Sequence, residues 1–245
     1  MNKKKIIAEQ IWSILAILVP TLLYIGYAVT KVYLWRFLIT AFLLALVLAY
    51  LLKAGAGRSG IWKEFGAIPL AFLFSIIGDF FLHLKGTSLQ ALCPSLPSFL
   101  TTFILGVAFF FLAHCSYIVF FLKHGKVNWF IMWTLVGLMA IYSATMLMPS
   151  IKDKAISIAV ILYILISCLS VSCAAGMKMD KGIKYLMVAG ISSLLFSDYL
   201  ISQHNFLHVN FGYFLMLPTY YLSQVLISIA LFTILLGKTR NRCRQ

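Results

Sequence analysis

Apolar residues dominate this chain in long runs, and short polar segments separate the runs along its whole length. Coiled as an α-helix, about 20 apolar residues span the hydrocarbon core of a bilayer. The runs do not alternate apolar and polar positions as barrel strands do, so they favour helices. The pattern predicts eight membrane-spanning helices, at Ile11–Val29, Tyr33–Leu52, Gly66–Leu84, Ser98–Leu122, Trp129–Met148, Ala155–Met177, Lys184–Ser202 and Phe211–Leu236.

The connections between these runs are short, so we expect residues 1–245 to form a single integral membrane domain of the all-α class, a polytopic helical bundle. The longest connection is Lys85–Pro97, which contains Gly86, Pro94 and Pro97 as helix breakers. The first apolar run is too long for the apolar region of a signal peptide, and no small-residue cleavage site follows it. We therefore expect it to be an uncleaved first span.

The basic residues predict the orientation of the bundle. With the N-terminus in the cytoplasm, fifteen of the twenty lysines and arginines fall in cytoplasmic segments. Such an excess is typical of cytoplasmic loops, so we expect both termini to face the cytoplasm. The five basic residues left for the outer segments are Lys31, Arg36, Lys85, Lys152 and Lys154.

Composition excludes the soluble classes of protein, because 62% of the residues are hydrophobic and only 11% are charged. The formal net charge of +14 does not indicate a nucleic-acid partner, because the basic residues are spread over short loops rather than gathered on one face. The five cysteines include no C-x-x-C pair and indicate packing residues rather than a disulfide framework.

Two carboxylates lie inside apolar runs, whereas the other four acidic residues lie near lysines or the chain start. These two are Asp79, in the third predicted span, and Asp198, in the seventh. A charge at the bilayer centre costs about 2.5–3.5 kcal/mol on insertion scales, so an intramembrane acid is a candidate functional residue. The alternative is a structural acid that is hydrogen-bonded to a neighbouring helix.

The predicted topology brings the two acids to similar depth, because both spans run outward and each acid follows the start of its span by about 13–14 residues at a rise of 1.5 Å. One interpretation is a 4+4 repeat in parallel orientation, with SIIGDFF and LLFSDYL in the third span of each half. Against it, aligning the two carboxylates leaves little other identity.

Other polar residues fall near the same level. His114 and Tyr117 share one face of the fourth span, Tyr220 and Gln224 share one face of the eighth, and Ser197 directly precedes the second acid. Each of these can also be explained as a packed, hydrogen-bonded residue. Three histidines near the outer surface, His83, His204 and His208, could bind a metal, but interfacial residues near lipid headgroups are the favoured interpretation, and we predict no metal and no cofactor.

Two acids in one site of low dielectric cannot both ionise easily, so one stays protonated and the pair offers a general acid and a general base. In a membrane the substrate should be a lipid with a bond that is cleaved by protonation and attack of water. A vinyl ether meets that condition. Composition and spacing allow proton transport equally well.

Four motifs, S-x-x-G-D, A-H-x-x-Y, S-D and T-Y-Y-x-x-Q, follow one another in the third, fourth, seventh and eighth spans. In their order and spacing the chain resembles the YhhN-like lysoplasmalogenase family of eight-span membrane proteins. The resemblance implies hydrolysis of the vinyl ether of lysoplasmalogens to a fatty aldehyde and glycerophosphoethanolamine or glycerophosphocholine, in a bacterial cytoplasmic membrane. It implies a lysophospholipid substrate and membrane lipids as partners. It also implies catalytic Asp79, Asp198 and His114, and substrate-binding Tyr117, Ser197, Tyr220 and Gln224.

Two other functions stay open at this point. A proton-coupled transporter or lipid-binding membrane protein would use the same carboxylates. A metal-dependent lipid amidase or esterase ranks last, because the predicted spans contain no compact set of metal ligands. Headgroup preference, oligomeric state and the division of acid and base roles between the two aspartates do not follow from the sequence.

Overall fold

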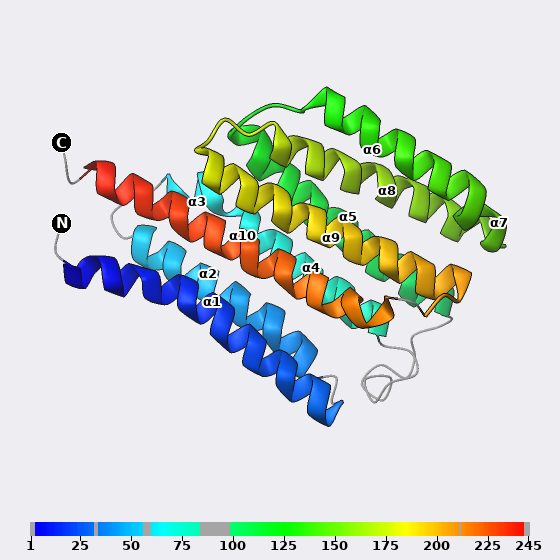
Figure 1. The fold of residues 1–245 in the computed structure, drawn as a ribbon, viewed down its shortest axis with the longest axis horizontal. Helices are drawn as coiled ribbons and strands as arrows, with labels where there is room; N and C mark the ends of the chain where they lie inside the picture. Colours follow the sequence, from blue (N-terminus) through cyan, green and yellow to red (C-terminus); the bar gives the residue numbers. More distant parts are fainter. Residues whose placement is uncertain (1–2, 32–33, 56–59, 84–98, 211, 243–245) are drawn as a thin grey trace.

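The computed structural model describes residues 3–31, 34–55, 60–83, 99–210 and 212–242, and these residues form an all-helical bundle (Figure 1). A π-helical turn, Ser143–Leu147, joins two of the helices. The α-helices are α1 Lys3–Thr30, α2 Leu34–Gly55, α3 Ile61–Phe65, α4 Ala67–His83, α5 Phe99–Lys123, α6 Trp129–Tyr142, α7 Met148–Ser150, α8 Lys154–Ala175, α9 Lys181–Leu207 and α10 Tyr213–Arg242.

Among the described residues, seven helices are long and apolar enough to cross a membrane: α1, α2, α5, α8, α9, α10 and the stretch Trp129–Ser150 that α6 begins. The chain is therefore built as a multi-pass membrane protein. Helix α4 is also apolar but has only 17 residues. Each predicted span overlaps a helix, while the count of eight crossings stays a prediction because α4 is short.

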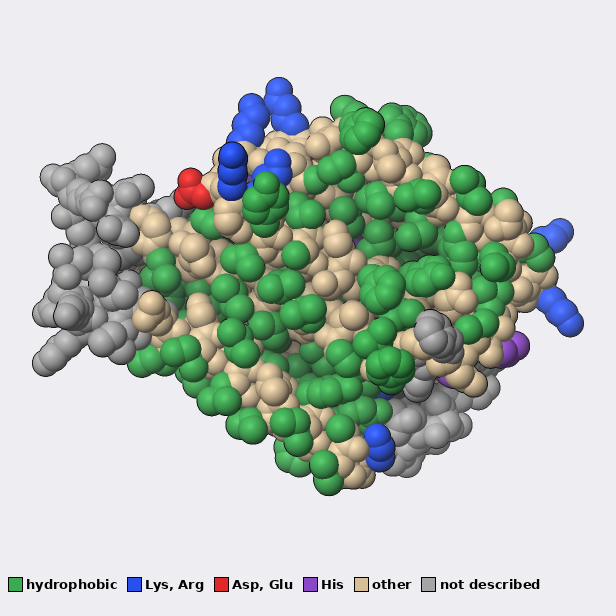
Figure 2. All heavy atoms as spheres, viewed as in Figure 1, with side chains coloured by type: hydrophobic (Ala, Val, Ile, Leu, Met, Phe, Trp, Pro, Cys, Tyr) green, Lys and Arg blue, Asp and Glu red, His purple; other side chains and the backbone are tan. Residues whose placement is uncertain are grey.

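The outer surface of the bundle is apolar in the way that a lipid-facing surface requires. Large side chains such as Phe130, Trp133 and Phe214 are 82%, 66% and 71% exposed. The face in Figure 2 is covered by hydrophobic side chains along its length, with lysines and arginines near the ends. In water such a surface would drive aggregation, whereas lipid tails solvate it.

The helices follow one another around the bundle so that both ends of the described chain lie at the same end (Figure 1). The most extensive contacts join α4 to α5 and α9 to α10. Helix α5 also packs on α8, and α10 packs on α2, while α6 covers α8 from outside. The shared end agrees with an even number of crossings; which side of the membrane it faces stays a prediction.

Two loops are fastened together at that end, and they set the position of α5 against α8. The backbone N–H of Lys126 donates to the carbonyl of Gly176 at 3.2 Å, and that of Lys178 donates to the carbonyl of His124 at 2.8 Å. Gly125 and Met177 form an antiparallel bridge between the same loops. A side chain at Gly176 would overlap the carbonyl of Lys126, which only glycine avoids.

Gly176→Ala should therefore destabilise the protein, because the new methyl group must push one backbone segment away from another. We expect a loss of about 1–3 kcal/mol, as for other overpacked sites, seen as a lower thermal unfolding midpoint in detergent. Gly182→Ala is the matched control, because a methyl group there would meet no atom within 4 Å. Equal midpoints for the two variants would contradict the proposed role of this contact.

Candidate active site

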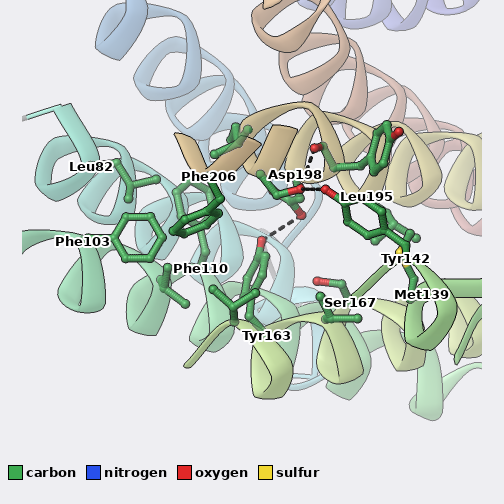
Figure 3. A pocket seen from close by; sticks show the side chains of 16 residues that line it. Leu82, Phe103, Phe110, Met139, Tyr142, Tyr163, Ser167, Leu195, Asp198 and Phe206 are labelled. Atoms are coloured by element: carbon green, nitrogen blue, oxygen red, sulfur yellow. Dashed lines mark hydrogen bonds between the residues drawn. The ribbon is translucent and has the colours of Figure 1, made fainter. Parts of the chain in front are cut away.

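Asp198 on α9 faces side chains from two neighbouring helices, and its contact with Tyr163 is drawn in Figure 3. The hydroxyl of Tyr163 on α8 donates to Asp198 Oδ2 at 2.8 Å. His114 Nε2 on α5 lies 3.8 Å from the same oxygen. The histidine side chain is fully buried, and that of Asp198 is 15% exposed. A buried carboxyl group needs such polar partners, so these three helices are tied together at Asp198.

The α8 side of this group consists of two residues one helical turn apart. Tyr163 and Ser167 are spaced i, i+4 and therefore lie on one face of α8. The oxygen of Tyr163 lies 3.3 Å from His114 Nε2, and Ser167 Oγ lies 3.2 Å from the same nitrogen. Both residues thus contact the histidine that faces Asp198.

This geometry differs from a serine-hydrolase triad. A triad needs the serine at one ring nitrogen of histidine and the carboxylate at the other. Here Ser167 and Asp198 both approach Nε2, and His114 Nδ1 has no hydrogen-bond partner among the described residues. One nitrogen cannot accept a proton from the serine while it donates to the carboxylate, so Ser167 is not poised as a nucleophile.

Asp79 on α4 lies in a second polar group, formed with α2 and α10. Arg36 acts electrostatically on Asp79, and so does Asp198. The buried hydroxyl of Tyr220 has no hydrogen bond of good geometry to the described residues, although Thr40 lies nearby and Asp79 acts on it electrostatically. The residue Arg36 is only 6% exposed, so its charge is held inside the bundle.

Two cavities meet at Asp198. The first, with a cavity volume of about 70 Å³, lies mainly between α5, α6, α8 and α9 and is almost entirely apolar. The second, with a cavity volume of about 170 Å³, is more polar. Its polar wall consists of Arg36, Asp79, Ser197, Asp198, His204, Asn205 and Tyr220. The residues common to both cavities are Leu82, Phe103, Phe110, Asp198 and Ile201.

The acid thus lies on the boundary between an apolar and a polar compartment. Phe103 and Phe110 lie on the same boundary, and Phe110 makes an edge-on ring contact with Tyr220, with centroids 6.1 Å apart. An amphipathic molecule with an apolar chain and a polar head would have its junction beside Asp198.

The sequence-predicted residues divide into three groups. Asp79, Asp198, Ser197 and Tyr220 line the polar cavity, where Ser197 Oγ donates to the carbonyl of Met216 at 2.8 Å. His114 contacts Asp198 but is absent from the described walls of both cavities. Tyr117 and Gln224 are joined to each other, hydroxyl to Oε1 at 3.3 Å, and are absent from the described walls of both cavities.

Three residues of the site were missed by sequence reasoning. Arg36 was assigned to an outer segment, although it follows the start of the predicted second span by three residues and is the one arginine inside a predicted span. That position was the available signal. Tyr163 and Ser167 belong to an apolar run, where only their i, i+4 spacing distinguishes them.

Of the three histidines considered for a metal, the structure describes the side chains of His204 and His208. No group of three potential ligand residues occurs in the described part of the chain. His204 Nδ1 lies 3.0 Å from Asn210 Oδ1, and the exposed His208 ends α9 with a positive φ of 55°. The side chain of His83 lies outside the described residues.

The YhhN family matches residues 31–231 of the chain, a range that contains every residue of both polar groups. No curated protein matches the chain significantly, and neither does any solved structure.

The Tyr117–Gln224 contact generates a stability prediction. Both residues are fully buried, so Tyr117→Phe should leave the Gln224 amide without its partner and cost about 1–3 kcal/mol. The double variant Tyr117→Phe/Gln224→Leu should be more stable than the single one, because both polar groups are then gone. Thermal unfolding tests this, with Tyr185→Phe at a 67% exposed position as the control. A double variant that loses the sum of both single effects would show that the contact contributes nothing.

Proposed function

This chain belongs to the YhhN family, and from that membership and the two buried carboxylates we propose that it is a lysoplasmalogenase-like hydrolase. It would cleave the vinyl ether of lysoplasmenylethanolamine or lysoplasmenylcholine, releasing a fatty aldehyde and the glycerophospho-headgroup. The observation that carries the proposal is the position of Asp198 on the boundary of an apolar and a polar cavity, with Asp79 on the polar side.

The proposed substrate pose follows from this division. The alkenyl chain lies in the apolar cavity, among residues such as Phe103, Val160 and Phe206. The glycerol and its headgroup lie in the polar cavity. The vinyl ether joins these two parts of the lipid, so it lies beside Asp198, and the glycerol oxygen faces Asp79.

The two aspartates then take different roles. Asp198 donates its proton to the vinyl carbon farther from the ether oxygen, and the double-bond electrons form the new C–H bond. An oxocarbenium ion results at the other carbon. Asp79, on which Arg36 acts electrostatically, takes a proton from the water that attacks this cation, and a hemiacetal forms.

Collapse of the hemiacetal restores both acids. Asp198, now a carboxylate, takes the hydroxyl proton while the C–O bond to glycerol breaks, and Asp79 gives its proton to the leaving oxygen. The products are an aldehyde and a free glycerol hydroxyl, with one water consumed. Tyr163, which donates to Asp198 Oδ2, stabilises the carboxylate form between the two steps, and His114 orients the acid and relays protons.

The remaining predicted site residues support the pose less directly. Ser197 and Tyr220 line the polar cavity and would contact water or the glycerol. Tyr117 and Gln224 would act by fixing α5 against α10 beneath it. We propose the bacterial cytoplasmic membrane as the location. With both termini in the cytoplasm, the polar cavity belongs to the outer half of the membrane, because its residues lie toward the opposite ends of α2, α4 and α9.

The reaction can be tested with purified protein, a lysoplasmalogen and the matching acyl lysophospholipid, analysed by mass spectrometry. We expect aldehyde from the vinyl ether lipid and no fatty acid from the acyl lipid. In D2O, the aldehyde, trapped at once by reduction, should carry one deuterium on the carbon next to the former carbonyl. Fatty acid release would indicate an esterase instead, and a folded sample that forms no product but moves protons across liposomes would favour a transporter.

Asp79→Asn and Asp198→Asn should each lower aldehyde release by at least about 100-fold, because each removes a proton-transfer group. Asp153→Asn is the matched control, since this exposed residue only caps α8 and asparagine caps equally well. Turnover close to that of the unaltered protein in either of the first two variants, at an unchanged unfolding midpoint, would remove that residue from the mechanism.

A further inference from the structure

Arg36 is a charged residue, and the proposed proton transfers do not require it to touch the reacting bond. It lies near the start of α2, is 6% exposed, and is the one lysine or arginine in the described wall of the polar cavity. A guanidinium inside an apolar bundle is costly, and such residues commonly belong to a substrate or ion site.

Arg36 has several contacts inside the bundle. Arg36 interacts electrostatically with Asp79, its guanidinium carbon lies 5.7 Å from the centre of the Tyr27 ring, and its carbonyl accepts from Tyr221 at 3.4 Å. A guanidinium has five N–H donors in a planar fork, which suits bidentate binding of a phosphate in addition to a neighbouring acid.

The wall beside Arg36 offers a further group that suits a phosphate ester. Asn205, at the last turns of α9, lines the same cavity and carries side-chain N–H donors, whereas the Nδ1–H of the neighbouring His204 faces Asn210 Oδ1 at 3.0 Å. A phosphodiester carries one negative charge, and Arg36 supplies one positive charge.

The order of charges matches the order of groups in a lysophospholipid. Asp198 lines both cavities, whereas Asp79 and Arg36 line only the polar one. Along the lipid, the glycerol lies between the ether bond and the phosphate. With the ether at Asp198 and the glycerol at Asp79, the phosphate reaches Arg36.

We propose that Arg36 binds the phosphate of the lysophospholipid headgroup, in a subsite formed with Asn205. This inference rests on the proposed function for the position of the ether bond. It identifies Arg36 as the residue that selects phospholipids over neutral ether lipids of the same chain.

The test uses ligands that cannot be hydrolysed, so that binding is measured apart from catalysis. One is a saturated 1-O-alkyl lysophospholipid, and the other is the 1-O-alkylglycerol of the same chain length, which lacks the phosphate. Titrations with detergent-solubilised protein should give about 10- to 100-fold tighter binding of the phospholipid, the range for hydrogen bonds to a charged group. Equal affinities in the unaltered protein would overturn the proposal without any variant.

Arg36→Gln should remove this preference while leaving alkylglycerol binding within about twofold, and Arg36→Lys should keep part of it as a point charge. Lys152→Gln, an exposed charge outside the cavity, should change neither affinity. If Arg36→Gln weakens both ligands equally at an unchanged unfolding midpoint, Arg36 serves only Asp79 and the fold, and the proposal is wrong.

A competition experiment identifies the source of the phosphate, and a turnover experiment separates the subsite proposal from the hydrolase proposal. Inorganic phosphate or glycerophosphocholine that competes as strongly as the lysophospholipid would assign the site to a free phosphate compound and overturn the lipid assignment. Selective phospholipid binding without aldehyde formation from lysoplasmalogen would retain the subsite and reject the hydrolase. Aldehyde formation at equal rates from lysoplasmalogen and 1-O-alkenylglycerol at limiting concentration would retain the hydrolase and reject the subsite.

Discussion

The burial of two carboxylates within a bundle of apolar helices is the constraint on which this structure depends. A carboxylate in such a place must be neutralised or bound by other polar groups, and each neighbouring helix supplies some of them. Asp198 on α9 contacts Tyr163 of α8 and faces His114 of α5. Asp79 on α4 interacts with Arg36 of α2 and Tyr220 of α10. Six helices are thereby placed around two acids, and the cavities form where these polar groups leave room.

The helices around the two polar groups contact one another in the same pattern. The extensive helix contacts come in matched pairs: α2 with α4 as α8 with α9, α4 with α5 as α9 with α10, and α5 with α8 as α10 with α2. If α1–α5 are taken as one half of the chain and α6–α10 as the other, each acid has one partner helix in its own half and one in the opposite half. Arg36 and Thr40 on α2 have the same i, i+4 spacing as Tyr163 and Ser167 on α8. A 4+4 repeat would produce this pattern. The repeat stays a prediction, but it would explain why the same arrangement of helices surrounds both acids. The partners of the two acids differ: Asp79 has a cation, and Asp198 has a hydroxyl and a histidine.

Sequence reasoning reached the helices and the two acids because both depend on hydropathy along the chain. An apolar run must be a helix, and an acid within it stands out against its neighbours. The partners of the acids were harder to predict, since they depend on how each helix is rotated about its axis. Tyr117 and His114 occupy neighbouring positions on α5, yet one contacts Gln224 and the other faces Asp198. Tyr163 did not stand out from its apolar neighbours in the sequence as the two acids did, because tyrosine is common in apolar helices. Arg36 was assigned to a loop because it lies close to a helix end, where basic residues are common.

The same geometry argues for a vinyl ether and against an acyl ester as the bond cleaved. Ester hydrolysis develops negative charge on a carbonyl oxygen, and an enzyme stabilises it with an activated nucleophile and aligned hydrogen-bond donors. In the proposed pose the groups nearest to the substrate are the two aspartates, whose ionised forms would oppose that charge, and Ser167 shares the nitrogen of His114 with Asp198 rather than being activated by it. Protonation of a vinyl ether develops positive charge instead. Two carboxylates in a site of low dielectric stabilise such a cation more strongly than water does. The sign of the charge that the transition state develops therefore favours ether cleavage at this site.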